Sequence, residues 1–329
     1  MKLIDFESHF YSDAIYKVLC SRTEFPFCEN ESKFHYCDDF VVPVIPALFL
    51  HTSEQVKARI SEMDACGVST QVLGMSQGLE EFPISEGVEC AKATHDLIYK
   101  ISKENPGRFI CFGTFPVSVT DAGIAEMERC KYELGFGGWM TSSNYRYSYI
   151  DDPEYLPLLA AAERLKLPLY IHPTAPVQER LCGLGSAMAG GAMGFTVDTA
   201  ITVTRLIFQG VFDQFPALQV IMGHLGEGLP YTLDRMDKRS RTLKADKSKN
   251  EHEPSYYFKH NIWVTTSGMF ANPPFECAKA TLGMDRILFG SDYPYEHLSD
   301  GVNYIKELPL SGSDREKLYY ENSERLFSL

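Results

Sequence analysis

Acidic and imidazole side chains stand at the ends of four apolar segments that otherwise read as buried strands. A carboxylate at the tip of a core strand is costly to bury unless a positive group meets it. Histidines and carboxylates gathered at one point can bind a divalent metal ion or transfer protons. The four segments end in Glu7 with His9, in His172, in His224 and in Asp292.

The first and last of these segments carry the clearest signals. Side chains two residues apart on a strand share a face, so Asp5, Glu7 and His9 are expected to point together. In the last segment, Pro294 prevents the strand from continuing and leaves Asp292 at its C-terminal tip.

The order of apolar runs and helical patterns predicts eight strands, each followed by a helix or by a loop that contains one. Eight short βα units without a linker predict a single domain, residues 1–329, folded as an α/β protein of the (β/α)8 or TIM-barrel class. Active sites of such barrels lie at the C-terminal ends of the strands, where the polar tips fall. We expect strands at 3–9, 69–75, 108–115, 136–141, 167–172, 218–224, 260–268 and 286–290.

The segment from about residue 20 to 50 is too long for an ordinary βα loop and is rich in aromatic residues and proline. Insertions of this kind often cover a site, so we interpret it as a lid. Its Phe25 and Phe27 could stack on an aromatic substrate or pack the lid against the barrel. We also expect a loop at 183–194 and an exposed, charged stretch at 237–253.

Composition and charge narrow the class of protein. The 329 residues have a net charge of −13, from 44 acidic and 31 basic side chains, which argues against nucleic acid as a partner. No apolar run approaches the roughly 20 residues that span a membrane, and the acidic start is not that of a secretory segment. Nine cysteines without a C-x-x-C pair suit a reduced, cytoplasmic setting.

The constellation of strand tips, rather than any single residue, points to a metal site. A lone histidine at a strand end is more often a packing residue, but the strands of a barrel project into one shared interior. Glu7, His9, His172 and Asp292 can therefore converge on one point. Mixed imidazole and carboxylate ligation suits Zn²⁺ or Mn²⁺ with one position open to water or substrate. Six other histidines are expected to be surface or packing residues: His35, His51, His95, His252, His260 and His297.

Four motifs together resemble the amidohydrolase superfamily: Asp-Phe-Glu-Ser-His (5–9), Ile-His-Pro (171–173), Gly-His-Leu-Gly-Glu (223–227) and Phe-Gly-Ser-Asp-Tyr-Pro (289–294). More narrowly, they resemble its metal-dependent, non-oxidative decarboxylases of aminocarboxymuconate semialdehyde, γ-resorcylate, 2,3-dihydroxybenzoate and 5-carboxyvanillate. Glu7 in a Glu-x-His arrangement, where many members have His-x-His, resembles the hydroxybenzoate decarboxylases. The carboxylated lysine that bridges two metals in binuclear members has no counterpart at 136–141, which implies one metal ion.

The resemblance implies roles beyond the four metal ligands. His224 is identified with a histidine taken to act in proton transfer, and Glu227 with a residue that orients its imidazole. The acid could be His224 or a protonated Asp292. Arg235 matches an arginine that binds the substrate carboxylate in related decarboxylases, in some across a subunit interface; it could equally pair with Asp234 or Asp237 on a helix surface. Members of the family are commonly dimers or tetramers, which implies a homodimer or homotetramer.

The expected activity is therefore the metal-dependent decarboxylation of a hydroxylated aromatic acid of the hydroxybenzoate type, in which a ring carbon is protonated and CO₂ is released. An alternative is a hydrolase of the same superfamily that acts on a carboxylated lactone. Glu7 favours the decarboxylase, because lactonase-type relatives usually have histidine there. A third reading is a barrel that serves only as a binding or scaffold protein, and ligands at every expected strand tip argue against it.

Overall fold

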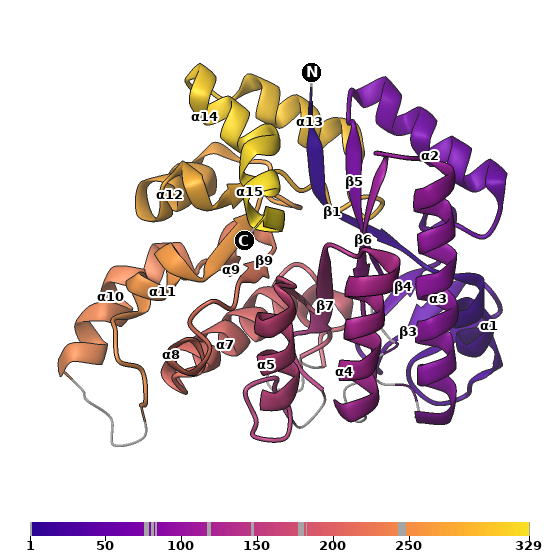
Figure 1. Cartoon of the computed structure of the whole chain (residues 1–329), viewed down its shortest axis with the longest axis horizontal. Coiled ribbons are helices and arrows are strands. Elements are labelled where there is room, and N and C mark those ends of the chain that lie inside the picture. Colours follow the sequence, from indigo (N-terminus) through magenta and orange to yellow (C-terminus); the bar gives the residue numbers. More distant parts are fainter. Residues whose placement is uncertain are drawn as a thin grey trace.

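The structure is a computed structural model that describes residues 2–75, 79, 82, 84–116, 120–145, 148–176, 181, 183–242 and 248–328. Its centre is a set of eight parallel strands with helices around it (Figure 1). The strands follow one another in chain order: β1 (Ile4–Phe10), β5 (Thr70–Met75), β6 (Phe109–Gly113), β7 (Gly138–Ser142), β8 (Leu169–His172), β9 (Val220–Met222), β10 (Ile262–Thr265) and β11 (Ile287–Leu288).

The first and last strands meet and close the ring. The N–H of Phe6 donates to the carbonyl of Phe289 at 2.7 Å, and the N–H of His9 donates to the carbonyl of Tyr293 at 2.7 Å. All the remaining pairs of neighbouring strands in the ring are parallel, as helical crossovers require. The predicted (β/α)8 barrel is confirmed.

The interior of the ring is a packed core below the site. The helix α15 (Asn322–Ser328) covers its N-terminal end, since Leu326 joins the interior cluster and Phe327 stacks on Phe6 at a ring distance of 5.3 Å. The C-terminal ends of the strands are therefore the end where a functional site can form. The apolar cluster of this core includes one side chain from each strand: Phe6, Val72, Phe112, Met140, Tyr170, Ile221, Trp263 and Leu288.

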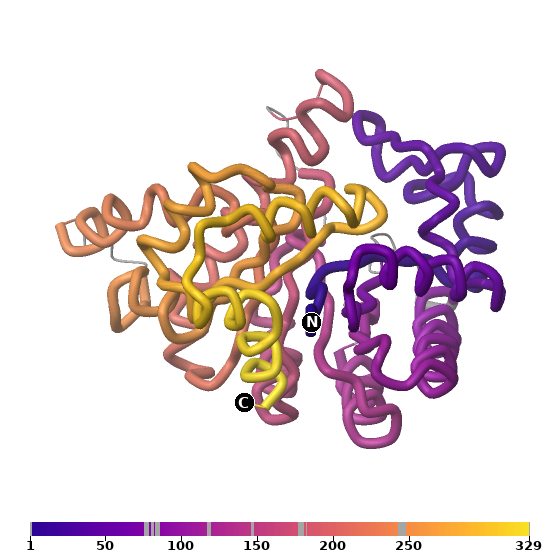
Figure 2. Tube along the Cα trace, turned by 90° about the horizontal axis from the view of Figure 1, so that it is seen from above, coloured from indigo at the N-terminus to yellow at the C-terminus, as the bar shows by residue number. Residues whose placement is uncertain are grey.

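The insertion at residues 20–50 contains a small antiparallel sheet, β2 (Phe27–Glu29), β3 (Lys33–His35) and β4 (Val41–Pro43). It reaches the segment that follows β8, because the N–H of Val41 donates to Ser186 Oγ at 3.1 Å. The two segments lie side by side although β1 and β8 are four strands apart in the ring (Figure 2). The interpretation of the insertion as a lid stays a prediction.

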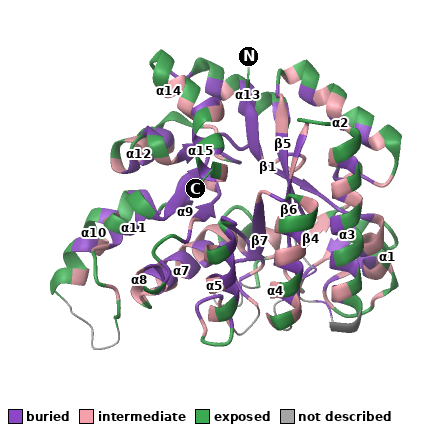
Figure 3. Ribbon diagram, viewed as in Figure 1, coloured by how far each residue is buried: buried purple, intermediate pink, exposed green. Residues whose placement is uncertain are grey.

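Helices surround the strands, with exposed residues on their outer faces and buried residues toward the barrel (Figure 3). In α2 (Ser53–Cys66), Thr52 and Gln55 form a capping box, and Gly67 ends the helix in a left-handed conformation. No described helix is both long and apolar enough to cross a membrane. The other helices are α1 (Asp13–Ser21), η1 (Pro46–Leu48), α3 (Ile84–Glu104), α4 (Thr120–Arg129), η3 (Cys130–Leu134), α5 (Leu156–Leu165), α6 (Ser186–Ala189), α7 (Gly194–Phe208), α8 (Val211–Gln214), α9 (His224–Glu227), α10 (Leu229–Thr242), α11 (Pro254–His260), α12 (Asn272–Leu282), η5 (Met284–Arg286), α13 (Leu298–Glu307), α14 (Gly312–Glu316) and η6 (Lys317–Glu321).

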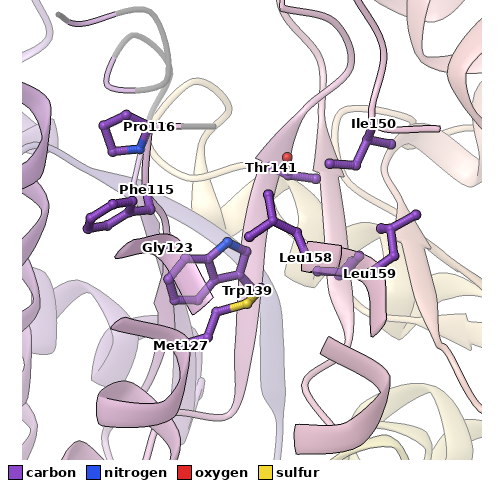
Figure 4. Close-up of a pocket in the computed structure, with 10 residues that line it drawn as sticks. Phe115, Pro116, Gly123, Met127, Trp139, Thr141, Ile150, Leu158 and Leu159 are labelled. Carbon is purple, nitrogen blue, oxygen red and sulfur yellow. The ribbon is translucent and has the colours of Figure 1, made fainter. Parts of the chain in front are cut away.

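Packing between the strands and the helices is tight. Behind β7, Trp139 lies beside Met127 of α4, with Leu158 and Leu159 of α5 on the other side of the same cavity (Figure 4). That cavity has a volume of about 20 Å³, which is room for about one water molecule. The wall of the barrel is therefore a rigid support for residues at the strand ends.

Two segments differ from the sequence-based expectation. The expected loop at 183–194 contains the short helix α6, because Ser186–Ala189 includes good helix formers between glycines. The stretch at 237–253, expected to be exposed and charged, begins inside α10. Buried Leu229 and Leu233 hold one face of that helix on the protein, and Asp237 is buried with them, where it accepts the N–H of Ser255 at 2.9 Å. Other charged residues of the helix, such as Lys238 and Arg239, are exposed, and residues 243–247 of the stretch lie outside the described residues.

Candidate active site

Three predicted ligand residues form one buried cluster at the C-terminal end of the barrel. Glu7 and His9 of β1 and Asp292, which follows β11, offer ligand atoms within 4.8 Å of one another. His9 Nε2 lies 3.7 Å from Glu7 Oε1 and 3.2 Å from Asp292 Oδ1. His172, at the end of β8, joins them with its ring centroid 4.7 Å from that of His9. The structure brings the four side chains together, and their role as ligands stays a prediction.

A β-bulge in β1 sets the direction of Glu7. The pairing of β1 with β5 shifts register between Asp5 and Ser8. Phe6 fills the interior layer, and the adjacent Glu7 also reaches the interior. The expectation that Asp5 and Glu7 share a face is therefore wrong, because the bulge interrupts the alternation and the Asp5 carboxylate bonds to Ser291 instead.

Close backbone approach and strain mark the other side of the cluster. A Cβ atom added to Gly290 would lie 3.1 Å from the Cβ of Glu7 and 3.0 Å from the Cβ of Thr265. Asp292 has φ 63°, a left-handed conformation that is unfavourable for a residue other than glycine. Residues in such conformations persist where the surrounding structure fixes them, often at functional sites.

Several buried atoms of the cluster suit a metal ion. Glu7 Oε1 and both ring nitrogens of His9 are buried without a hydrogen-bond partner among the described residues. Glu7 Oε2 accepts the hydroxyl of Thr265 at 2.7 Å, which fixes the carboxylate. Leaving a buried polar atom unpaired costs about 1–3 kcal/mol. Imidazole and carboxylate donors that converge in this way fit Zn²⁺ or Mn²⁺.

Charges in the cluster depend on one another. Burial alone would raise the pKa of Asp292, but contacts with His224 and His9 hold it well below its ordinary value. The pKa of Glu7 is also lowered, against the effect of burial, by its contact with His9. Asp292 and Glu7 in turn raise the pKa of His9 to about 9 despite burial, whereas burial and His9 lower the pKa of His172 to about 3. The two buried anions need positive charge beside them, which a divalent cation would supply.

His224 faces the cluster from a left-handed turn that follows β9. Residues 224–228 all have positive φ, between 51° and 83°, so the strand expected to reach residue 224 ends at Met222. The turn places Glu227 Oε1 2.6 Å from His224 Nδ1, and His224 Nε2 lies 3.8 Å from Asp292 Oδ2. Against the effect of burial, Glu227 and Asp292 raise the pKa of His224 well above its ordinary value.

The other predicted site residues lie on different elements. Arg235 is exposed on α10 and lines a groove between α7 and α10. Phe25 stacks on Phe27 at a ring distance of 5.5 Å, and Phe27 stacks on His35 at 4.5 Å. Contact of these residues with a substrate stays a prediction.

Sequence reasoning missed several residues that surround the four predicted ligands. Thr265 holds Glu7, and the ring of Tyr295 lies 5.5 Å from that of His9. Thr265 ends the apolar run of β10 as the ligands end theirs, so a search for polar strand tips could have found it. Ser291 could not be found in this way, because its bond to Asp5 depends on the closure of the ring.

A second group of potential ligands is buried outside the barrel interior. His95 Nδ1 lies 2.7 Å from Glu126 Oε1 and 3.4 Å from Cys130 Sγ. His95 Nε2 accepts the N–H of Thr114 at 3.1 Å, and Arg129 donates to both oxygens of Glu126. Neither His95 nor Glu126 has a buried polar atom without a partner among the described residues. This group is a packing network, as expected for His95.

Comparison with known proteins places this barrel and site in a family. The family model described as Amidohydrolase matches residues 58–329, and the chain belongs to that family. Among its relatives, the γ-resorcylate decarboxylase of Rhizobium sp. (strain MTP-10005) is 31% identical over 289 residues, which cover 82% of this chain and 86% of that protein. The resemblance inferred from the four motifs is confirmed.

Two solved structures are similar over the whole chain. The 5-carboxyvanillate decarboxylase from Sphingomonas paucimobilis has a TM-score of 0.88 and 28% identity, covering 100% of this chain and 99% of that chain. The dihydroxybenzoic acid decarboxylase from Polaromonas sp. JS666, with bound manganese and the inhibitor 2-nitroresorcinol, has a TM-score of 0.85 and 27% identity, covering 100% and 97%. These relatives are decarboxylases, and the second holds a divalent metal.

Proposed function

We propose that this protein is a metal-dependent, non-oxidative decarboxylase of a hydroxylated aromatic acid. The observation that carries the proposal is the meeting of Glu7, His9, His172 and Asp292 at the C-terminal end of the barrel, with unpartnered atoms of Glu7 and His9 among them. The activities named for the relatives, on γ-resorcylate and on 5-carboxyvanillate, support it.

The same four residues would hold one divalent ion. Manganese is the better candidate, because half of the ligands are carboxylates and because the Polaromonas relative holds manganese. When bound, the ion would supply a Lewis acid for the carboxylate and the ortho-oxygen of the substrate, and would stabilise the negative charge that develops there. Zinc remains the alternative for this donor set.

We propose His224 as the residue that delivers the proton. Glu227 holds its Nδ1 at 2.6 Å, which leaves Nε2 directed toward the cluster, 3.8 Å from Asp292 Oδ2. We assign proton transfer to His224 Nε2 and orientation of the imidazole to Glu227. Asp292 is the alternative acid, but its carboxyl group would then have to bind the metal ion and also carry the proton.

The bond changes balance without an oxidant or a reductant. The proton from His224 bonds to the ring carbon that carries the carboxylate. The bond between that carbon and the carboxylate then breaks, its electron pair restores the aromatic ring, and CO₂ leaves. His224 can regain a proton from solvent, since its side chain is 18% exposed.

Substrate contacts and assembly complete the proposal. Because Arg235 is exposed on α10, we propose that it binds the substrate carboxylate of a neighbouring subunit in a homodimer or homotetramer. Phe25 and Phe27 belong to the insertion, and its contact with the segment after β8 supports a lid above the substrate ring. The cytoplasmic location expected from the sequence stays a prediction.

Metal content and CO₂ release test the function together. Wild-type protein and Asp292→Ala would be analysed for metals and then incubated with a panel of hydroxybenzoates, with carboxylated lactones as the matched alternative substrates. We expect about one manganese or zinc ion per chain in the wild type, little in the variant, and CO₂ from at least one acid.

Each other outcome points to a different conclusion. Bound metal with lactone opening and no CO₂ would replace the decarboxylase by a hydrolase of the same family. Wild-type protein that binds neither metal would contradict the site itself.

A further inference from the structure

We infer that Asp5 is a positioning residue for both carboxylate ligands, Glu7 and Asp292. Asp5 belongs to β1, as Glu7 does, and its fully buried side chain accepts hydrogen bonds from four donors. The inference rests on the proposed function, because it concerns how the same site holds its metal ion.

The four donors come from three strand segments that meet where the ring closes. Asp5 Oδ1 accepts the N–H of Ser291 at 2.8 Å and the N–H of Glu7 at 3.3 Å. Asp5 Oδ2 accepts the hydroxyl of Ser291 at 2.6 Å and the side-chain amide of Gln71 at 2.9 Å. One carboxylate therefore ties β1 to β5 and to the segment after β11.

The bond to Glu7 compensates for the bulge. The pairing of β1 with β5 passes from Asp5 opposite Gln71 to Ser8 opposite Leu73, so Glu7 has no partner in that ladder. A buried N–H without an acceptor is costly, and Asp5 Oδ1 supplies the acceptor. The same bond fixes the backbone at the residue whose carboxylate must reach the interior.

The bonds to Ser291 act on the second ligand. Both the N–H and the hydroxyl of Ser291 point to Asp5, and the next residue, Asp292, has φ 63°. The N–H of Asp292 donates to the carbonyl of Glu7 at 3.0 Å. The left-handed ligand residue is thus held on one side by Asp5 and on the other by the strand that Asp5 also fixes.

Replacing Asp5 by Asn can separate the effect of its hydrogen bonds from the effect of its negative charge. Gln71 Oε1 is buried without a hydrogen-bond partner among the described residues. In Asp5→Asn, the oxygen can still accept the N–H groups of Ser291 and Glu7. The new amide can donate to Gln71 once that side chain turns its oxygen toward it, and to Ser291 Oγ once that hydroxyl donates instead to the carbonyl of Glu7, which lies 3.4 Å from it. Asn therefore preserves the geometry, whereas Ala removes all four acceptor contacts.

The test is a titration of metal-free protein with Mn²⁺, using variants whose folded state is first verified by urea unfolding. We expect Asp5→Ala to bind Mn²⁺ about 10–100-fold more weakly than the wild type, the range found when residues behind metal ligands are removed. Asp5→Asn should recover most of that loss, and kcat should follow the metal occupancy. Ser291→Ala, which removes one donor, should bind Mn²⁺ measurably more weakly than the wild type, by up to about 10-fold.

Two controls separate this inference from neighbouring explanations. Glu126→Gln alters an equally buried carboxylate in the packing network and should leave the Mn²⁺ affinity unchanged. Glu7→Gln tests the proposed metal site directly. If wild-type and Glu7→Gln protein bind Mn²⁺ with equal affinity, the result counts against the proposed function rather than against the role of Asp5.

Folded Asp5→Ala with wild-type Mn²⁺ affinity would overturn the inference. It would also be overturned by Asp5→Asn binding as weakly as Asp5→Ala, because charge rather than geometry would then be responsible. If Asp5→Ala does not fold, Ser291→Ala decides, and wild-type affinity in that variant contradicts the role.

Discussion

Two histidine–glutamate pairs in this barrel look alike at one nitrogen and differ at the other. In both, the glutamate lies close to Nδ1: His224 Nδ1 is 2.6 Å from Glu227, and His95 Nδ1 is 2.7 Å from Glu126. The Nε2 atom of His95 accepts the backbone N–H of Thr114. The Nε2 atom of His224 instead lies 3.8 Å from Asp292, beside the ligand cluster.

The difference decides what each pair can do. Because His95 Nε2 is an acceptor, the ring proton must sit on Nδ1 and point to Glu126, so Nε2 has no proton to give. His224 carries no such restraint, and its Nε2 can hold a proton that faces a substrate. The residue types of a cluster are therefore a weaker guide to function than the atoms that the fold leaves available.

The largest expected effect comes from His224. His224→Gln removes the proposed acid and should lower kcat by about 10²–10⁴-fold, while Mn²⁺ content stays that of the wild type. The measurement is steady-state CO₂ release together with metal analysis. His95→Gln is the matched control, and its folded fraction should keep the wild-type kcat. Normal turnover in His224→Gln would instead identify Asp292 as the acid.

A smaller effect, on stability, is expected at the second pair. Burial alone would raise the pKa of Glu126, but contacts with His95 and Arg129 lower it to about 2, from an ordinary value of 4.5. The depressed pKa means that this stabilisation is present above pH 4.5 and is lost as the pH falls toward 2. Glu126→Gln should therefore reduce the free energy of unfolding by about 3 kcal/mol at pH 7.

Urea unfolding at several pH values checks this expectation. The gap between wild type and Glu126→Gln should narrow between pH 4.5 and pH 2, and metal content should be equal in the two proteins. A gap that does not change with pH would mean that the carboxylate charge is not the source of the stability.

The barrel and the ligand positions could be predicted because each depends on a local pattern. Most strands contain an apolar run, and a polar residue that ends such a run falls at the C-terminal rim by the rules of the fold. That reasoning predicted His172 at the end of β8, His9 one residue before the end of β1, and Asp292 beyond β11, which itself ends at Leu288. It needed no knowledge of which strands meet across the ring.

The remaining features depend on backbone conformation that no period or composition reveals. The bulge lets Phe6 and Glu7 both face the interior, although alternation assigns them to opposite faces. The left-handed turn after β9 begins at His224, which was expected to lie in the strand, and it brings Glu227 to His224, a pairing that only the family resemblance implied. Likewise, the separation of His95 and Glu126 by 31 residues in the sequence gives no indication of their contact.

The smallest expected effect tests whether the second group could be a metal centre at all. Cys130 lies 3.4 Å from His95 Nδ1, and with His95 and Glu126 it offers three potential ligand types within a short distance. Burial raises the pKa of the Cys130 thiol, so the thiolate that a metal requires is disfavoured. Cys130→Ala should cost about 1 kcal/mol of stability and leave metal content at one ion per chain, measured with Mn²⁺ and separately with Zn²⁺. A second zinc ion in the wild type that disappears in Cys130→Ala would show that the His95–Glu126 pair binds metal, and the contrast with the His224–Glu227 pair would then no longer rest on the lack of an available atom at His95.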